Sequence, residues 1–343
     1  MYNRVQKYNT IYEINTLFDH NLTHLKVHLK IENFYSKKPV VLTIGTFDGV
    51  HAGHRAVIEV LKAKANKING ETALLTFSPH PRVVLHPDNH NLRLLNTRKE
   101  KEALLENAGL DHLIVVRFDI ALSRLTPLDY VRKLLAEGIK PTEIVIGDDH
   151  RFGRNREGSF SSLKEMGLMF NFSVTALNAE RIREIRVSST KARDAIIEGQ
   201  IEHANDLLSH PFPLSGTVVE GDKLGKTIDF PTANLKLSDP LKIVPMDGVY
   251  VVWARINEGK WMKGMMNIGC RPSVIKTDSG ETTIEVHFIG YQGDCYGQAI
   301  EVRIVKRLRD EMLFNGLNEL KAALSRDRDE TLELLQFAVP PVL

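Results

Sequence analysis

Cysteines and long apolar runs are both scarce in this sequence. Its 343 residues include only Cys270 and Cys295, which are too few for a disulfide framework and lack the companion ligands of a zinc cluster. The longest apolar runs are strand-sized, well short of the roughly 18 to 20 residues that cross a bilayer. Residues 1–39 hold no apolar core of signal-peptide length, so we interpret them as an N-terminal extension of unknown role. These absences favour a protein of the reducing cytoplasm.

An excess of charge of either sign is also lacking. The 45 Lys and Arg residues are nearly balanced by 43 Asp and Glu residues, which leaves a net charge of +2. This charge is too small to predict a nucleic-acid or membrane-surface partner. Hydrophobic residues make up 43% and charged residues 26%, as in ordinary globular proteins. At roughly 150 residues per domain, the length suggests two domains.

The first half of the chain alternates apolar runs with segments of helical spacing. Strands are expected at 40–47, 72–77, 113–118, 143–147 and 172–177. Helices are expected at 54–68, after the capping box of Thr97 and Glu100, and from Thr126-Pro127 with proline at the first helical position. This alternation predicts an α/β domain over residues 40–210, built on a doubly wound parallel sheet.

The pattern changes near residue 211, where Pro211 and Pro213 follow a polar helical stretch. Short β-rich runs then recur at 214–220, 248–256, 261–268, 282–289 and 299–305, separated by turn residues. This spacing predicts an antiparallel barrel or sandwich over residues 211–343. A helix at about 317–335 is expected to cover an end or edge of that domain.

The first chemical signal is a glycine-rich segment that runs from Gly45 to His54, between the first strand and its helix. Ligands collect at this edge of an open α/β sheet, and glycines let backbone N–H groups approach a phosphate. His51 and His54 could together donate hydrogen bonds to a phosphate whose charge grows in a transition state. A tight turn with surface histidines is the alternative, and a zinc pair lacks a third ligand.

Two basic segments in the same domain are candidates for polyphosphate binding. The segment 147–154 follows a strand and carries Arg151 and Arg154, and the segment 188–193 is interpreted as the start of a later helix and carries Arg193. Both are expected at one edge of the sheet. The alternative is that Ser189 only caps a helix and the arginines only form a solvated face.

In the second domain, residues 221–227 resemble a P-loop but have only three residues between Gly221 and Gly225 and no following helix. We interpret them as a glycine-hinged flap that closes over phosphates. Thr232 and Asn234 lie two apart, on one face of an extended segment, and their oxygen atoms suit Mg²⁺. A plain polar turn is the alternative.

The segment 282–289 alternates, so Glu285 faces away from Ile284 and Val286. A carboxylate that lines a cleft in a barrel could act as a general base toward a hydroxyl group. If that face meets solvent, Glu285 has no such role. The alternation alone does not decide between the two.

Several motifs together resemble one known family. The segments G-T-F-D-G-V-H-A-G-H, T-F-S-P-H-P, G-D-D-H-R-F-G and S-S-T-K-A-R are similar to the adenylyltransferase module of the prokaryotic bifunctional riboflavin kinase/FAD synthetase. The segments G-K-T-I-D-F-P-T-A-N-L, D-G-V-Y, N-I-G-C-R-P, E-V-H and L-R-D-E-M-L-F are similar to its riboflavin kinase module. The resemblance runs in family order from about residue 40 to the C-terminal helix.

The resemblance implies a nucleotidyltransferase-like N-terminal domain and two ATP-dependent reactions with Mg²⁺. Glu285 would activate riboflavin for phosphorylation to FMN, with Thr232 and Asn234 organising the metal ion. His51 and His54 would support transfer of an adenylyl group from ATP to FMN, which gives FAD and pyrophosphate. ATP and its phosphates are assigned to Gly45, Phe47, Asp48, Gly49, Gly53, Ser188, Ser189, Thr190, Arg193, Gly221, Gly225 and Lys226. Flavin binding is assigned to Asp149, Arg151, Asn267 and Arg309.

Four positions depart from the usual family pattern. Asp229 replaces a common glycine and puts negative charge near phosphates, His150 replaces a Phe, Ala192 an Ile and Ser273 a Thr. Two other functions therefore stay open beside the bifunctional enzyme: one active module with the other degenerate, or a non-catalytic flavin-binding regulator. An oxidoreductase is disfavoured because no G-x-G-x-x-G follows the first strand. The sequence leaves the oligomeric state open.

Overall fold

The computed structural model describes residues 24–88, 92–221, 224–270 and 282–341. Contacts divide the chain into two compact units, and the division falls between Thr190 and Lys191. This division comes before residue 211, where the sequence changes from alternating strands and helices to short β-rich runs. The reason is that the helix over residues 201–208 packs on strands of the second unit. The module boundaries at residues 39/40 and 210/211 stay predictions.

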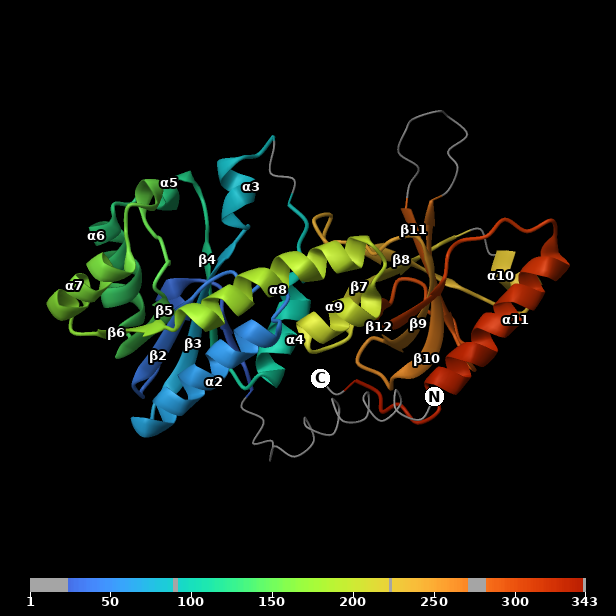
Figure 1. The fold of residues 1–343 in the computed structure, drawn as a ribbon, viewed down its shortest axis with the longest axis horizontal. Helices are drawn as coiled ribbons and strands as arrows, with labels where there is room; N and C mark the ends of the chain where they lie inside the picture. The colour runs from blue at the N-terminus through green and yellow to red at the C-terminus, as the bar shows by residue number, and fades with distance from the viewer. Residues whose placement is uncertain (1–23, 89–91, 222–223, 271–281, 342–343) are drawn as a thin grey trace. The chain divides into compact units, whose positions relative to one another are not determined.

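The first unit is built on a parallel sheet, which confirms the predicted α/β fold. Among the described residues six strands are hydrogen-bonded in the order β1-β4-β3-β2-β5-β6, with every pair parallel (Figure 1). They are β1 (Lys26–His28), β2 (Val40–Ile44), β3 (Glu71–Ser78), β4 (His112–Arg117), β5 (Glu143–Gly147) and β6 (Ser173–Leu177). All five residues of β2 are buried, as expected for a strand with helices on both faces.

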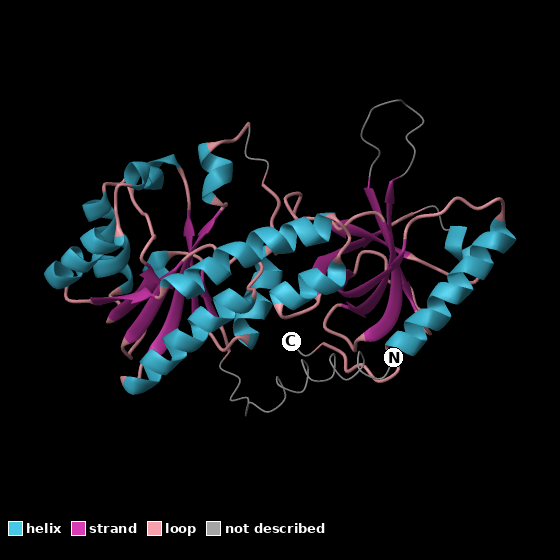
Figure 2. Cartoon of the chain, in the orientation of Figure 1, coloured by secondary structure: helices cyan, strands magenta, loops and turns pink. Residues whose placement is uncertain are grey.

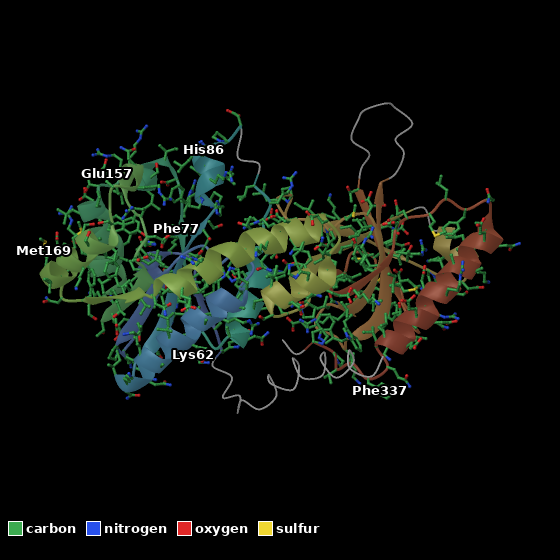
Figure 3. The ribbon with its side chains drawn as sticks, viewed as in Figure 1. Lys62, Phe77, His86, Glu157, Met169 and Phe337 are labelled. Carbon is green, nitrogen blue, oxygen red and sulfur yellow. The ribbon has the colours of Figure 1, made fainter. Side chains whose placement is uncertain are left out.

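Helices cover both faces of this sheet. Val41 packs in a cluster with α2 (Ala52–Lys67) and α4 (Arg98–Asn107). Its neighbour Leu42 packs on the other face, with α6 (Pro127–Tyr130), the π-helix η2 (Val131–Ile139) and α7 (Phe160–Phe170). Figure 3 labels Lys62 on α2 and Met169 on α7, and Met169 is 67% exposed on the side of α7 away from the sheet. The shorter elements are η1 (Ile31–Asn33), α3 (Pro81–Leu85), α5 (Ile120–Ser123) and η3 (Arg154–Arg156).

The predicted helix starts are present. The Thr97 hydroxyl accepts from the Glu100 N–H at 3.3 Å, and the Glu100 carboxylate accepts from the Thr97 N–H at 2.8 Å. Thr126 caps α6 in the same way through the Asp129 N–H, with Pro127 at the first turn. These local bonds satisfy N–H groups that a helix start leaves without a partner.

Strand β1 lies within the predicted N-terminal extension and was not expected from the sequence. It pairs with only three residues of β4, and side chains add to its attachment. His28 Nε2 lies 3.1 Å from His112 Nδ1, and His112 Nε2 lies 2.9 Å from the Glu71 carboxylate. His28 Nδ1 is also 3.1 Å from the Asn33 carbonyl oxygen. This chain of contacts, which we call the histidine relay, joins β1, β3, β4 and η1.

The second unit is a closed antiparallel barrel, which confirms the barrel and excludes the sandwich. Its described strands close in the order β10-β11-β8-β7-β12-β9 (Figure 2). They are β7 (Phe212–Val219), β8 (Ala233–Leu237), β9 (Gly248–Ile256), β10 (Met262–Cys270), β11 (Thr282–Phe288) and β12 (Ala299–Arg309). Inward residues such as Ile284 and Val286 are buried.

Helices α9 (Ile201–Leu208) and α11 (Leu317–Leu334) pack against the barrel. Asn205 of α9 donates to the Ile304 carbonyl and accepts from the Phe212 N–H, which ties α9 to β12 and β7. On α11, Leu320 and Leu324 pack on a cluster that includes Phe230, and the predicted final helix is thereby confirmed. The short α10 (Leu224–Thr227) lies in the predicted flap. Across the described parts of the chain, no helix combines the length and hydrophobicity of a membrane span.

Candidate active sites

The glycine-rich segment after β2 forms a tight loop that delivers two histidines to the start of α2. Phe47, Gly49 and Val50 have positive φ angles of 46°, 90° and 38°, which a short turn between a strand and a helix requires here. At Gly45, a Cβ atom would lie only 3.1 Å from the Phe47 ring. Gly45 therefore lets the Phe47 ring fold back against the loop.

The rings of Phe47, His54 and His51 are stacked in that order. The ring centroids of Phe47 and His54 are 4.4 Å apart and those of His54 and His51 are 3.7 Å apart. His51 is fully buried and caps α2, because its Nδ1 accepts from the His54 N–H at 3.3 Å. Its Nε2 lies 2.7 Å from the Ser189 hydroxyl. Since Nδ1 accepts, the hydrogen of a neutral His51 is on Nε2 and is donated to Ser189.

A cavity of about 320 Å³ opens beside this stack. It lies at the carboxyl ends of β2 and β5, where parallel α/β sheets bind ligands. Its lining includes the predicted site residues Gly45, Phe47, His54 and Asp149. Of the two histidines His54 lines this cavity, while His51 lies behind it. Gly53 is buried in the first turn of α2.

Asp48 and Lys101 hold the loop from outside the cavity. The Asp48 carboxylate accepts from the backbone N–H groups of Leu95 and Asn96 at 3.0 to 3.2 Å. Lys101 of α4 donates to the Thr46 carbonyl at 2.7 Å. Burial lowers the pKa of Lys101, and the negative charge of Asp48 opposes that shift. The structure thus gives Asp48 a backbone-anchoring contact rather than a place in the cavity lining.

The segment 188–193 is interior to a helix and does not begin one, so that prediction is wrong. Helix α8 runs over Ala179–Ile197, and Ser189 consequently is not an N-cap. Ser189 bonds to His51, Thr190 is exposed and Arg193 is half-buried one turn further along. The Ser188 side chain lies outside the described residues.

The loop after β5 supplies one wall of the cavity through Asp149 and His150. Arg151, the next residue, is exposed. Burial, and secondly the charge of Arg156, lowers the pKa of His150 to about 4. His150 is therefore a neutral side chain in the cavity wall at neutral pH.

In the barrel, three predicted site residues form one row across neighbouring strands. Glu285 of β11 is paired with Asn234 of β8 on one side and with Asn267 of β10 on the other. Directly opposed residues of an antiparallel ladder point to the same face of the sheet. All three are half-buried, so this outward face is partly covered rather than fully solvated.

Thr232 completes this group. Its hydroxyl donates to Glu285 Oε2 at 2.9 Å. A Cβ atom at Gly221 would lie 2.0 Å from the Asn234 amide nitrogen, so a side chain at position 221 would displace the Asn234 amide from its present place. The hydroxyl, amide and carboxylate oxygens of Thr232, Asn234 and Glu285 are ligand types that suit Mg²⁺, and this donor set fits such an ion. No group of three or more His, Cys, Asp or Glu side chains able to hold a metal was found among the described residues.

The flap residues lie close to this group in the sequence and in the fold. At Gly225 a Cβ atom would collide with the Phe230 carbonyl oxygen at 2.1 Å. Lys226 is exposed, and its ammonium group lies 5.8 Å from the centre of the Tyr296 ring. Asp229 has a positive φ of 67° and forms an ion pair with Lys321 of α11 at 2.5 Å. Its carboxylate is thus partly neutralised by a cation.

The predicted flavin residues of the barrel are held by acidic side chains. Asn267 donates to Glu311 at 3.1 Å. Arg309 forms a two-point ion pair with Asp327 of α11, at 2.7 to 3.2 Å, and its guanidinium lies 5.9 Å from the Phe314 ring.

Ser273, one of the four departures from the family pattern, lies outside the described residues. Ala192 is fully buried in α8, where the smaller side chain packs without exposure.

Sequence reasoning missed two residues that position these sites. Lys101 fixes the first loop, and its only sequence signal is a lysine in the capped first turn of a predicted helix. His287 contacts the Pro231 carbonyl oxygen at 2.8 Å. The motif E-V-H pointed to His287 but gave it no role.

Comparisons with known proteins agree with this division into two sites. The family model for FAD synthetase matches residues 34–191, and the model for riboflavin kinase matches residues 208–335. A bifunctional riboflavin kinase/FMN adenylyltransferase from Escherichia coli (strain K12) is 38% identical over 300 residues, which cover 88% of this chain and 94% of that protein. One of the same description from Listeria monocytogenes is 36% identical over 85% of this chain and 91% of that protein.

Among solved structures, a crystal structure described as a macrolide-efflux protein from Streptococcus pneumoniae is similar to this chain. The two are 28% identical with a TM-score of 0.76, over 90% of this chain and 98% of that one. The shared fold therefore extends over both units.

Proposed function

This chain belongs to the family of bifunctional riboflavin kinases/FMN adenylyltransferases, and we propose that its two candidate sites divide the two reactions between them. It is a transferase that phosphorylates riboflavin to FMN and adenylylates FMN to FAD, with ATP as the second substrate of each step. We assign the kinase step to the barrel row around Glu285. The adenylyl transfer is assigned to the cavity beside His54.

The contact between Thr232 and Glu285 carries the kinase assignment. A carboxylate that already accepts a hydrogen bond from one hydroxyl is placed to accept the proton of another, the 5′-hydroxyl of riboflavin. The freed oxygen attacks the γ-phosphorus of ATP, and ADP leaves. Bound Mg²⁺ would neutralise phosphate charge, and Thr232 and Asn234 supply oxygen atoms suited to hold it, which leaves the Glu285 carboxylate to accept the proton.

In the N-terminal cavity, the FMN phosphate attacks the α-phosphorus of ATP and pyrophosphate leaves. No proton has to be removed from the attacking phosphate, so positioned hydrogen-bond donors matter more than a base. We propose that His54 steadies the transferred group and that His51, bonded to Ser189, keeps the His54 ring in place. Asp149 lines the same cavity, and Arg151 and Arg193 remain proposed ligands of flavin and phosphate.

Chromatography of the products from riboflavin and Mg-ATP tests the proposal. The parent protein should give FMN, FAD and pyrophosphate. Glu285→Gln keeps the size of the side chain but removes the base, which typically contributes ~10²- to 10⁴-fold, and should lose most FMN formation while converting supplied FMN to FAD normally. His54→Ala should show the opposite pattern, with a loss of ~10²- to 10³-fold in FAD formation.

Each variant thus controls for the other. FMN as the only product of the parent would favour the alternative of one active module, and neither product would favour a flavin-binding regulator. If Glu285→Gln phosphorylates riboflavin within about twofold of the parent rate, Glu285 is not the base. Activity that survives removal of Mg²⁺ by a chelator would contradict the proposed metal role.

We also propose a cytoplasmic location, which rests only on the low number of cysteines, two in the whole sequence.

A further inference from the structure

The first observation concerns the end of the ladder between β8 and β11. This ladder pairs Asn234 with Glu285 and Ala233 with Val286, and there it stops. His287 follows Val286 on β11, and its side chain lies on the same face of the sheet as that of Glu285. Its Nδ1 lies 2.8 Å from the Pro231 carbonyl oxygen. The His287 side chain therefore links β11 to the segment before β8 at the position where the backbone hydrogen bonds between the two strands have stopped.

The direction of this hydrogen bond is fixed by chemistry. A carbonyl oxygen only accepts, so His287 Nδ1 carries the hydrogen and donates it. Pro231 is the residue immediately before Thr232. The bond therefore fixes the peptide group from which the Thr232 side chain departs toward Glu285.

Packing holds the other end of the same segment. Phe230 is 3% exposed in a cluster with Ile228 and Met265, and its N–H donates to the Gly225 carbonyl at 2.8 Å. The Phe230 ring lies 5.2 Å from the His287 ring and 5.8 Å from the Arg328 guanidinium. Segment 230–232 is thus held by its core side chain at one end and by His287 at the other.

We propose that His287 is a positioning residue for riboflavin phosphorylation, because its Nδ1–H holds the Pro231 carbonyl and so keeps the Thr232 hydroxyl on Glu285. The inference rests on the proposed kinase site and adds a residue that acts on it only through Thr232. His287 itself transfers no proton and touches no substrate.

Three substitutions separate the hydrogen bond from the bulk of the ring. The amide nitrogen of His287→Asn occupies nearly the place of Nδ1 and should keep kcat/KM for riboflavin phosphorylation within about threefold of the parent. His287→Leu fills space without a donor and should lose about tenfold, the loss expected for one hydrogen bond. His287→Asp has the size of the Asn variant but presents only acceptors to Pro231, and should lose at least as much as Leu.

A double-mutant cycle with Thr232→Ala tests the route of action. If His287 acts through Thr232, then His287→Leu should change kcat/KM by less than about twofold once Thr232 is already Ala, since coupled residues are not additive. A tenfold loss in both backgrounds would show that His287 acts elsewhere and would overturn the inference. Equal losses in the Asn and Asp variants would overturn it as well.

Two controls separate this inference from the proposed function. Conversion of supplied FMN to FAD should stay at the parent rate in every His287 variant, which shows that the N-terminal unit is intact, and a melting temperature of the barrel close to that of the parent shows that the barrel is folded. If the parent forms no FMN, the kinase assignment fails. If the parent forms FMN and Thr232→Ala is as active as the parent, the kinase activity stands but the positioning role of His287 is overturned.

Discussion

His150 loses its charge on folding because the structure buries it in the wall of the N-terminal cavity. Its pKa falls from 6.5 to about 4, chiefly by burial and secondly by the charge of Arg156. Protons then bind more tightly to the unfolded chain than to the folded one between these two pH values. The stability that neutral His150 contributes is complete above pH 6.5 and is lost as the pH falls toward 4.

We therefore expect His150→Phe, which carries no titratable group, to flatten the pH dependence of stability. The free energy of unfolding of the parent should fall between pH 6.5 and 5 more steeply than that of the variant, by at most about 1.4 kcal/mol per pH unit. Urea unfolding at several pH values measures both slopes. Equal slopes would show that His150 is protonated to the same extent in the folded and unfolded chains.

Asp229 replaces a glycine that is common in the family, and its backbone angle and its ion pair explain how the chain accommodates this carboxylate. The left-handed backbone at φ 67° explains why glycine is common there, and Asp is among the residues that tolerate it. The exposed ion pair with Lys321 contributes little to stability, but it places a cation beside the carboxylate that the sequence predicts to lie near bound phosphates.

The expected result is that Lys321→Ala raises the KM for ATP in riboflavin phosphorylation by a few-fold, because the Asp229 charge then acts without a counter-charge. Asp229→Gly should leave this KM within about twofold of the parent. The double variant Asp229→Gly/Lys321→Ala should have the same KM for ATP as Asp229→Gly, since the negative charge of Asp229 is absent from both. Steady-state kinetics at low ionic strength, where screening is weakest, give all three values. A double variant as poor as Lys321→Ala would remove Asp229 from the explanation.

At the scale of elements, strand β1 depends on the histidine relay. The relay has three contacts but four ring nitrogens, and its two ends are the acceptors of Asn33 and Glu71. Burial lowers the pKa of His28, and its contact with the Asn33 carbonyl oxygen opposes that shift. Burial alone raises the pKa of Glu71, but hydrogen bonds from His112 and Ser36 and the nearby positive charges outweigh it and lower the pKa.

His112→Phe should loosen β1, because it keeps an aromatic ring in a fully buried place but removes both relay contacts. Loss of these bonds at a cost of ~1 to 3 kcal/mol should speed exchange of the backbone amides of residues 26–28 by about 5- to 150-fold. Hydrogen–deuterium exchange read peptide by peptide measures this, with α11 as an internal reference. Unchanged exchange at residues 26–28 would mean that the backbone pairing alone retains the strand.

The same contrast explains which elements the sequence could predict. Buried parallel strands such as β2 and capped helices such as α4 carry their signal locally, in continuous apolar runs and in the Thr97–Glu100 box. Strand β1 carries none, because three residues of mixed polarity form a strand only when β4 is there to pair with them. The start of α8 was misplaced for a related reason, since serines that resemble a cap lie in its interior.

For the sites, motifs identified side chains but not their distances. Thr232 and Glu285 are far apart in the sequence and meet only through the pairing of β8 with β11. Lys101 and His287 act through backbone carbonyl groups, which any residue supplies. No pattern of side chains in the sequence therefore marks their partners.

At the scale of the whole molecule, the structure refines where the barrel can be separated from the rest of the chain. A fragment that begins at Phe212 contains every described strand of the barrel but lacks α9, and with it the bonds of Asn205 to β12 and to the Phe212 N–H. A fragment that begins at Gln200 retains them.

Both fragments should fold and phosphorylate riboflavin, because the barrel has its own core. The longer fragment should melt several degrees higher, because a gain of about 1 to 2 kcal/mol shifts the melting temperature by roughly 4 °C per kcal/mol in a domain of this size. Calorimetry and product chromatography measure the two properties. Equal melting temperatures would place α9 outside the cooperative unit of the barrel, and two insoluble fragments would contradict its independence.

The position of β12 in the closed barrel also has a consequence for synthesis on the ribosome. The last strand to be translated lies between the first, β7, and β9, so the barrel stays open until residue 309 has left the exit tunnel. The parallel sheet has all its described strands once residue 177 has emerged. A ribosome that pauses between these points displays a finished sheet followed by unpaired strand edges, which are prone to aggregate. Nascent chains arrested within the barrel are therefore expected to aggregate more readily than chains arrested after the sheet is complete.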